Sequence, residues 1–148
     1  MNARADDPWA FLQDLAPPEP RGYEPGTFAS VVERFIADRN QPGGKPLGIS
    51  QMYSLRRVQR APIGTKMLGE IKAVDFLDHC KRRRAAGVKP QTVNQDMTYA
   101  SGVLKYALEI WEQPGAEQAY AAYRKAKPQL VREQLVGKSQ PRDRRPTE

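Results

Sequence analysis

The chain has 148 residues, a length typical of one domain, and its 24 Lys and Arg against 17 Asp and Glu give a formal net charge of +7. No apolar run is long enough to span a bilayer, no secretory signal is visible, and the single cysteine, Cys80, cannot form an internal disulfide. We therefore expect a cytoplasmic protein with no membrane partner and an attraction to polyanions.

Residues 1–26 are predicted to be a proline-rich leader. Residues 1–24 hold two basic and five acidic groups, which leaves a balance of +10 on the remainder. Five prolines prevent a long helix, so we expect an extended or disordered segment. A brief helix beginning at Pro8 would present Trp9, Phe11, Leu12 and Leu15 on one side. That side either packs loosely on its own domain or docks on a partner subunit.

Four helices are predicted after the leader, over residues 27–40, 49–60, 72–86 and 90–112. Thr27 and Ser50 are placed to cap the first two, and Gly87 ends the third. The residues expected on the inward faces are Phe28, Val31, Val32, Phe35 and Ile36; Met52, Leu55 and Val58; Ala73, Phe76, Leu77 and Cys80; and Val93, Met97, Ala100, Leu104, Ala107 and Trp111.

A last helical segment is predicted over residues 116–135, broken or restarted at Pro128, with Leu130, Val131 and Leu135 as its apolar contacts. Residues 137–148 carry no apolar side chain and are predicted to be a flexible basic linker. No alternation of period two predicts a strand. We therefore expect an all-α bundle of four to five helices over residues 27–136.

The sequence gives no support for catalysis in this segment. A metal site at His79 would need two or three further ligands that do not occur at suitable spacing, so a solvated helical histidine is expected. Cys80 is expected to be a small buried hydrophobe, and Asp75 and Asp78 are expected to be surface carboxylates. No cofactor, metal or catalytic residue is predicted.

Two predicted helix faces and the turn between them favour nucleic acid as the ligand. The outer face of the second helix carries guanidinium groups suited to phosphate, and the outer face of the fourth carries amides and hydroxyls that reach base edges. The start of the fourth helix also offers unpaired backbone N–H groups to an anion. The candidate residues are Tyr53, Arg56, Arg57, Arg60, Lys89, Gln91, Thr92, Asn94, Gln95, Thr98 and Lys105. The run Lys81–Arg84 is weaker support, because such runs usually face water.

A register of short motifs resembles the core-binding domain of tyrosine recombinases, the phage-integrase family, over about residues 27–112. Its elements are Tyr53-Ser54-Leu55-Arg56-Arg57, Ala61-Pro62-Ile63-Gly64, Leu68-Gly69-Glu70-Ile71, Asp75-Phe76, Arg82 to Gly87, Val88 to Asp96 and Leu104-Lys105-Tyr106-Ala107. The resemblance implies a SAM-like helical bundle that clamps one side of a recombination-site duplex with its second and fourth helices. The same candidate residues would then face the DNA.

The resemblance also implies a non-catalytic segment. In this family the catalytic residues lie in a carboxy-terminal domain, so this chain is expected to be the amino-terminal part of an integrase from a mobile element, cut at the linker. Its expected partners are double-stranded DNA and other recombinase protomers, in a bacterial, nucleoid-associated setting. An alternative is a helical protein-interaction module that meets an acidic partner or another protomer.

Overall fold

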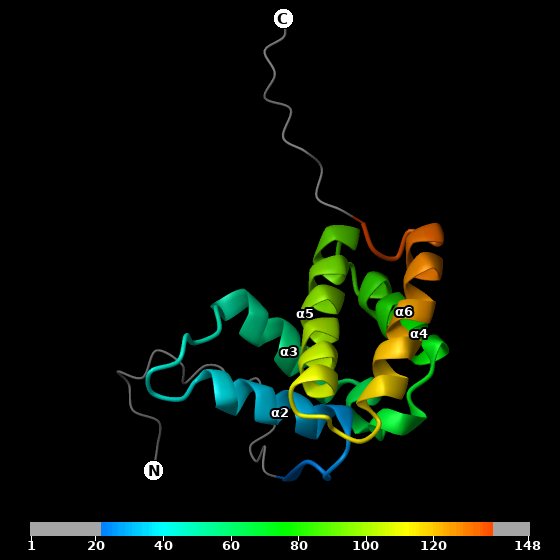
Figure 1. Ribbon diagram of the computed structural model, residues 1–148. Coiled ribbons are helices and arrows are strands. Elements are labelled where there is room, and N and C mark those ends of the chain that lie inside the picture. The colour runs from blue at the N-terminus through cyan, green and yellow to red at the C-terminus, as the bar shows by residue number, and fades with distance from the viewer. Residues whose placement is uncertain (1–21, 138–148) are drawn as a thin grey trace, which may run out of the picture.

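The computed structural model describes residues 22–137, so the predicted leader up to residue 21 and the linker from residue 138 lie outside the described part. Within it the chain folds into five α-helices (Figure 1), and no strand is present there beyond an isolated bridge between Thr27 and Met67. The all-α prediction is confirmed. The helices are α2 (Phe28–Arg39), α3 (Ile49–Arg60), α4 (Ala73–Ala85), α5 (Pro90–Glu109) and α6 (Ala116–Arg132), with two 3-10 turns, η2 (Pro62–Thr65) and η3 (Leu68–Glu70), between α3 and α4.

The starts of the first two helices are fixed in different ways. Thr27 caps α2 as predicted, because its hydroxyl accepts the N–H of Ser30 at 3.2 Å. The prediction for Ser50 was wrong: the extended residue before α3 is Gly48, and Ser50 lies exposed within the first turn. At α4 the Asp75 carboxylate accepts the backbone N–H of Lys72 at 2.8 Å, which satisfies one donor that the helix itself leaves unpaired.

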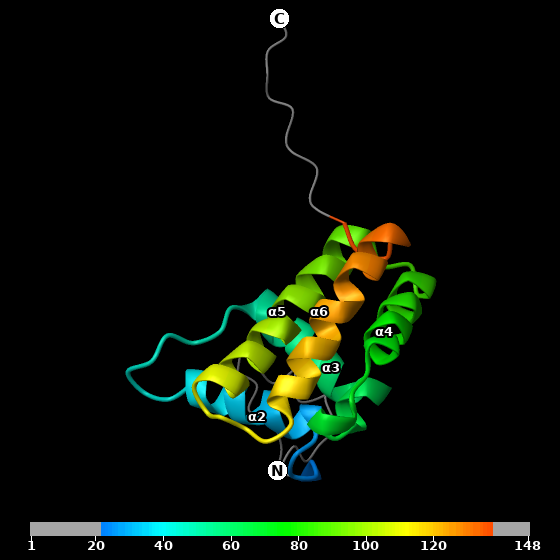
Figure 2. The same cartoon turned by 45° about the vertical axis from the view of Figure 1, so that its right-hand side comes forward.

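Helix α5 is the centre of the domain, with α3 on one side and α6 on the other (Figures 1 and 2). Five of the six residues predicted on its inward stripe are at most 1% exposed: Val93, Met97, Ala100, Leu104 and Ala107. Trp111 was wrongly predicted there, since it lies past the end of the helix and is only partly buried. Its ring packs against the edge of Tyr106 and lies 3.9 Å from the Arg34 guanidinium.

Helix α6 runs without a break through Pro128, contrary to prediction. Pro128 cannot donate to the carbonyl of Arg124 one turn earlier, but both residues are exposed, so water can take that carbonyl. Val131, which was expected to pack inward, is 55% exposed, whereas Leu130 and Leu135 are buried as predicted.

After α6 the chain turns back onto the start of α5 (Figures 1 and 2). Gln134 adopts a left-handed conformation with φ of 58°, Leu135 and Val136 are buried, and the N–H of Gly137 donates to the carbonyl of Pro90 at 3.1 Å. The described chain therefore finishes beside the first turn of α5.

The turn η2 packs directly on the end of α3. A Cβ atom at Gly64 would lie 2.5 Å from the carbonyl oxygen of Val58, so only glycine fits there. Within residues 22–137 no helix has both the length and the apolar character needed to cross a membrane.

Candidate nucleic-acid interface

A buried carboxylate, Asp96 on α5, joins three helices. Asp96 is 1% exposed and accepts the Ser54 hydroxyl of α3 at 2.6 Å. From α4, the Arg83 guanidinium donates to it through Nε at 3.0 Å and lies at 2.8 Å through Nη2. Arg57 of α3 completes the group, with its Nη2 atom 4.0 Å from the carboxylate. Because a charge at this depth needs both a counter-charge and hydrogen bonds, these contacts fix α3, α4 and α5 relative to one another.

Beside this group lies a basic depression, here called the arginine hollow, with a volume of about 290 Å³. Its walls come from the last turn of α3, from the carboxyl-terminal half of α4 and from the residues at the start of η2. The lining residues are Arg57, Arg60, Ala61, Pro62, His79, Arg82, Arg83 and Ala86.

Four guanidinium groups share the arginine hollow with one nearby carboxylate, Asp96. Asp96 pairs closely with Arg83 and loosely with Arg57, while Arg60 and Arg82 have no ion pair within the described part of the chain. Burial lowers the pKa of Arg57, and the nearby charge of Arg83 lowers it further. The hollow is therefore a concentration of positive charge that the protein itself only partly neutralises.

His79 forms part of the wall of this hollow, and the prediction that it would be solvated was wrong. It is 3% exposed, and burial lowers its pKa to about 4, so the ring is neutral at physiological pH. Among residues 22–137, neither Nδ1 nor Nε2 has a hydrogen-bond partner, and the buried Nε atom of Arg57 has none there either. Three polar atoms at one site thus have no partner in the described part of the chain, a departure from the usual pairing of buried polar groups.

Cys80 is fully buried, as predicted. Burial raises the pKa of its thiol to about 12, and Asp96 contributes in the same direction. The side chain is therefore a neutral thiol packed in the core and has no nucleophilic character at neutral pH.

A second depression, the polar hollow, lies on the outer face of α5 and has a volume of about 470 Å³. Its lining residues are Gln91, Thr92, Asn94, Gln95, Thr98 and Tyr99. The Gln95 amide donates to the Tyr99 hydroxyl at 3.1 Å, and the Thr98 hydroxyl donates to the carbonyl of Asn94 at 2.9 Å. Five of the predicted site residues therefore lie together on one uncharged, hydrogen-bonding surface.

The two hollows share no lining residue, and the arginine hollow is connected to α5 through Asp96, which Arg57 and Arg83 contact. Thr92 lies one helical turn before Asp96 and Tyr99 lies three residues after it, so both flank the carboxylate along the helix surface. Arg57 approaches that same carboxylate from α3, so its guanidinium meets α5 one helical turn from Thr92. Tyr53, one turn before Arg57, is partly exposed and close enough to affect its pKa.

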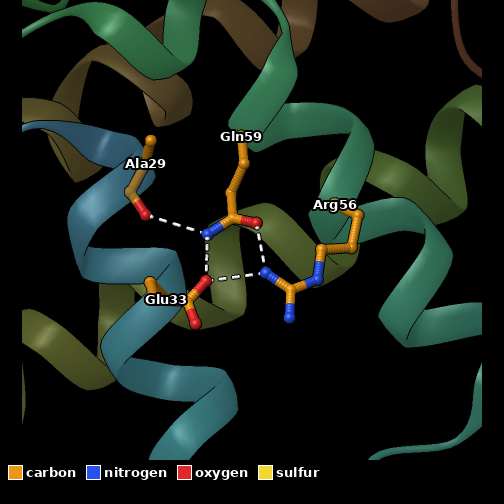
Figure 3. Close-up of polar contacts among 4 residues, drawn as sticks. All are labelled: Ala29, Glu33, Arg56 and Gln59. Atoms are coloured by element: carbon orange, nitrogen blue, oxygen red, sulfur yellow. Dashed lines mark hydrogen bonds and ion pairs between the residues drawn. The ribbon is translucent and has the colours of Figure 1, made fainter. Parts of the chain in front are cut away.

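Arg56 is placed differently from the other predicted site residues (Figure 3). Its Nη1 atom donates to Glu33 at 2.6 Å and to Gln59 at 2.7 Å, and Gln59 in turn donates to Glu33 and to the carbonyl of Ala29. This network fastens α2 to α3. Arg56 lines neither hollow, and its guanidinium already has partners within the fold.

Lys89 and Lys105 lie outside both hollows. Lys89 is the exposed residue that precedes α5, and no side chain caps that helix start. Lys105 is exposed and follows Thr98 by seven residues, about 10 Å along the same helix face.

Arg82, Arg83, His79 and Tyr99 belong to the two hollows and were not among the predicted site residues. The sequence did contain one indication that an arginine of α4 faces the core, namely the position of Asp96. A carboxylate at the border of the apolar stripe of a central helix requires a cationic partner, and the Lys81–Arg84 run was the nearest supply in the sequence.

Among the described residues no cluster of three His, Cys, Asp or Glu side chains is placed to hold a metal ion. Comparisons with family models, with curated proteins and with solved structures found no match. The fold and the two hollows therefore define a small all-α domain with one basic and one polar surface depression, and its function is a matter for proposal.

Proposed function

We propose that this chain is a non-catalytic, duplex-DNA-binding domain of a site-specific recombinase of the tyrosine recombinase family, supporting DNA integration and recombination by a mobile element. The observation that carries the proposal is the position of Arg57. Arg57 lines the arginine hollow and lies 4.0 Å from Asp96 on α5, one helical turn from Thr92, which lines the polar hollow.

The division of side chains between the hollows supports this function. Guanidinium groups are suited to the charged sugar–phosphate backbone, which positions a protein on DNA without reading sequence. Amides such as those of Asn94, Gln91 and Gln95 are suited to base edges, adenine in particular. A domain that reads a duplex requires both kinds of group.

The charge of the chain supports a polyanionic partner. Its formal net charge is +7, and a protein that makes about four phosphate contacts should lose roughly a hundredfold in affinity between about 50 and 200 mM salt. A mobility-shift titration of the full chain with a mixed-sequence duplex at several salt concentrations tests this. Affinity that is independent of salt, or equal for an uncharged polymer, refutes the proposal.

Two substitutions distinguish contacts to the DNA backbone from contacts to the bases. Arg60→Ala should weaken binding to every duplex by a similar factor, because it removes a backbone contact, whereas Asn94→Ala should change the order of preference among duplexes. Lys125→Ala on α6 is the matched control, since it removes an exposed charge outside both hollows and should leave affinity nearly unchanged. If Lys125→Ala weakens binding as much as Arg60→Ala does, the interface is misplaced.

On this proposal the segment performs no strand cleavage, and the reacting groups belong to a catalytic domain outside this sequence. Incubation with nicked recombination-site DNA should give no covalent adduct. Further protomers would join on the DNA, and the domain would act at the bacterial nucleoid. Light scattering at two protein concentrations separates this from the alternative, a protein-interaction module, for which a stable dimer unaffected by added DNA is expected.

A further inference from the structure

The arginine hollow is an open depression with room for more than a single contact. Its volume of about 290 Å³ corresponds to about ten water molecules, enough for a phosphate group with part of its hydration shell. Three separate elements supply its walls, α3, α4 and η2, so a bound group would be approached from several directions. Such a shape fits a compact, many-sided anion better than a flat one.

The charge balance of the hollow calls for an anion. Four arginines line it and one carboxylate, Asp96, stands beside it, which leaves three positive charges in excess. The carboxyl ends of α3 and α4 also lie here, and their dipoles together offset about one further charge. A net excess remains, and mutual repulsion of the guanidinium groups costs free energy as long as nothing neutralises it.

A second, independent observation is the set of unpaired polar atoms in the same wall. His79 is only 3% exposed, yet within the described residues neither of its ring nitrogens has a hydrogen-bond partner, and the buried Nε of Arg57 has none. Leaving such buried atoms unpaired costs free energy, because each has lost its hydrogen bonds to water. An oxygen-rich ligand would accept from the Arg57 N–H and from the single N–H of the neutral imidazole after a small adjustment of either side chain.

We propose that the arginine hollow is a binding site for one phosphate group, held by Arg57, Arg60 and Arg82 with His79 as a neutral donor. Arg83 stays paired with Asp96 and serves to position the wall. A phosphate group is favoured over a carboxylate because its oxygens point in several directions and can meet guanidinium groups from α3 and α4 at once. That this phosphate belongs to a DNA backbone rests on the proposed function, whereas a free phosphate would use the same chemistry.

The first experiment is an NMR titration of the full chain with inorganic phosphate, at constant ionic strength against chloride. The only histidine in the sequence is His79, so its ring signals report on the hollow without ambiguity. Saturable shifts of these signals and of the Arg57 and Arg82 side chains are expected. Shifts that rise linearly without saturation, or that are equal in chloride, overturn the site.

Variants then locate the site. Arg60 and Arg82 are exposed and have no ion pair in the described chain, so Arg60→Gln combined with Arg82→Gln should fold normally, which a thermal melt checks. The double variant should bind phosphate at least about tenfold more weakly. Lys125→Gln combined with Lys127→Gln removes the same charge from exposed positions of α6 and should bind like the wild type. If both double variants bind phosphate equally weakly, phosphate is attracted by the overall positive charge and not by the arginine hollow, which would refute the proposed site.

The source of the phosphate is separated by competition. If the hollow holds a backbone phosphate, saturating inorganic phosphate should weaken duplex binding by the wild type and not by the arginine double variant. If phosphate saturates the hollow and duplex binding is unaffected, the site takes a free phosphate and the backbone assignment is overturned. If no phosphate binds while the duplex still does, the inference fails and the proposed function survives.

Discussion

Acidification from pH 8 to pH 5 should destabilise the domain through His79. Burial lowers the pKa of this side chain in the native state to about 4, against 6.5 for the free side chain. At a pH between these two pKa values, His79 binds a proton in the unfolded chain but not in the native state. The contribution of His79 to the free energy of unfolding is therefore fully present above pH 6.5 and is lost as the pH falls towards 4. The loss at pH 5 is about 2 kcal/mol and approaches about 3 kcal/mol below pH 4.

Urea unfolding at fixed ionic strength between pH 8 and pH 5 measures this loss, and the ring signals of the only histidine give the native pKa directly. His79→Phe is the control, because it retains a flat ring and removes the titrating group. Only the difference between pH values is compared, so a shift in the overall stability of the variant does not matter. A native titration midpoint at or above 6.5, or the same pH dependence in His79→Phe, contradicts the reasoning.

The remaining predictions concern the packing around the two hollows. Asp96→Asn should lower the free energy of unfolding by about 3 kcal/mol, because Arg57 and Arg83 then face each other without a counter-charge. In the same urea assay the control Asp78→Asn should change this free energy little, because Asp78 is exposed and has no ion pair in the described chain. Gly64→Ala should destabilise the domain by about 1–3 kcal/mol, because its Cβ would lie 2.5 Å from the Val58 carbonyl oxygen. Gly102→Ala, in open space on α5, should stabilise it by about 1 kcal/mol. The reverse order of stabilities would show that η2 can move away from α3. Cys80 should react with a thiol reagent only as fast as the domain unfolds, so rapid labelling under native conditions would contradict its burial.

The helical framework was predictable from spacing, because apolar residues at helical intervals leave few alternatives. On α5, Val93, Met97, Ala100, Leu104 and Ala107 repeat at intervals of three and four, and all are buried. Thr27 and Gly87 mark helix limits through local chemistry, a hydroxyl cap and a left-handed turn with φ of 95°, that does not depend on the rest of the fold.

On α4 the predicted inward face was rotated relative to the real one. Apolar residue types alone placed its centre near Leu77, yet Leu77 is only partly buried and His79 is buried. The true inward face also carries Arg83, which pairs with Asp96 from another helix. A polar residue inside a core is recognisable only when its partner is known, and that partner is set by tertiary packing.

The same limit applied to the candidate site. The outward residues of α5 could be assigned from the helix period, since a polar face opposite a regular apolar stripe must point away from the core. The arginine hollow could not, because its wall joins residues from α3 and α4 that are some twenty positions apart in the sequence. Arg56 and Arg57 are adjacent in sequence and chemically identical, yet one fastens α2 and the other lines the hollow.

The hydrogen bond from Gly137 to Pro90 has a mechanical consequence. Because the N–H of Gly137 is hydrogen-bonded to Pro90 in the first turn of α5, a pull applied at residue 137 would load α5 as well as α6. Tension at that point is thus transmitted to the helix that carries Asp96 and the polar hollow. Strain at this anchor would therefore act on the same helix whose outer face lines the polar hollow.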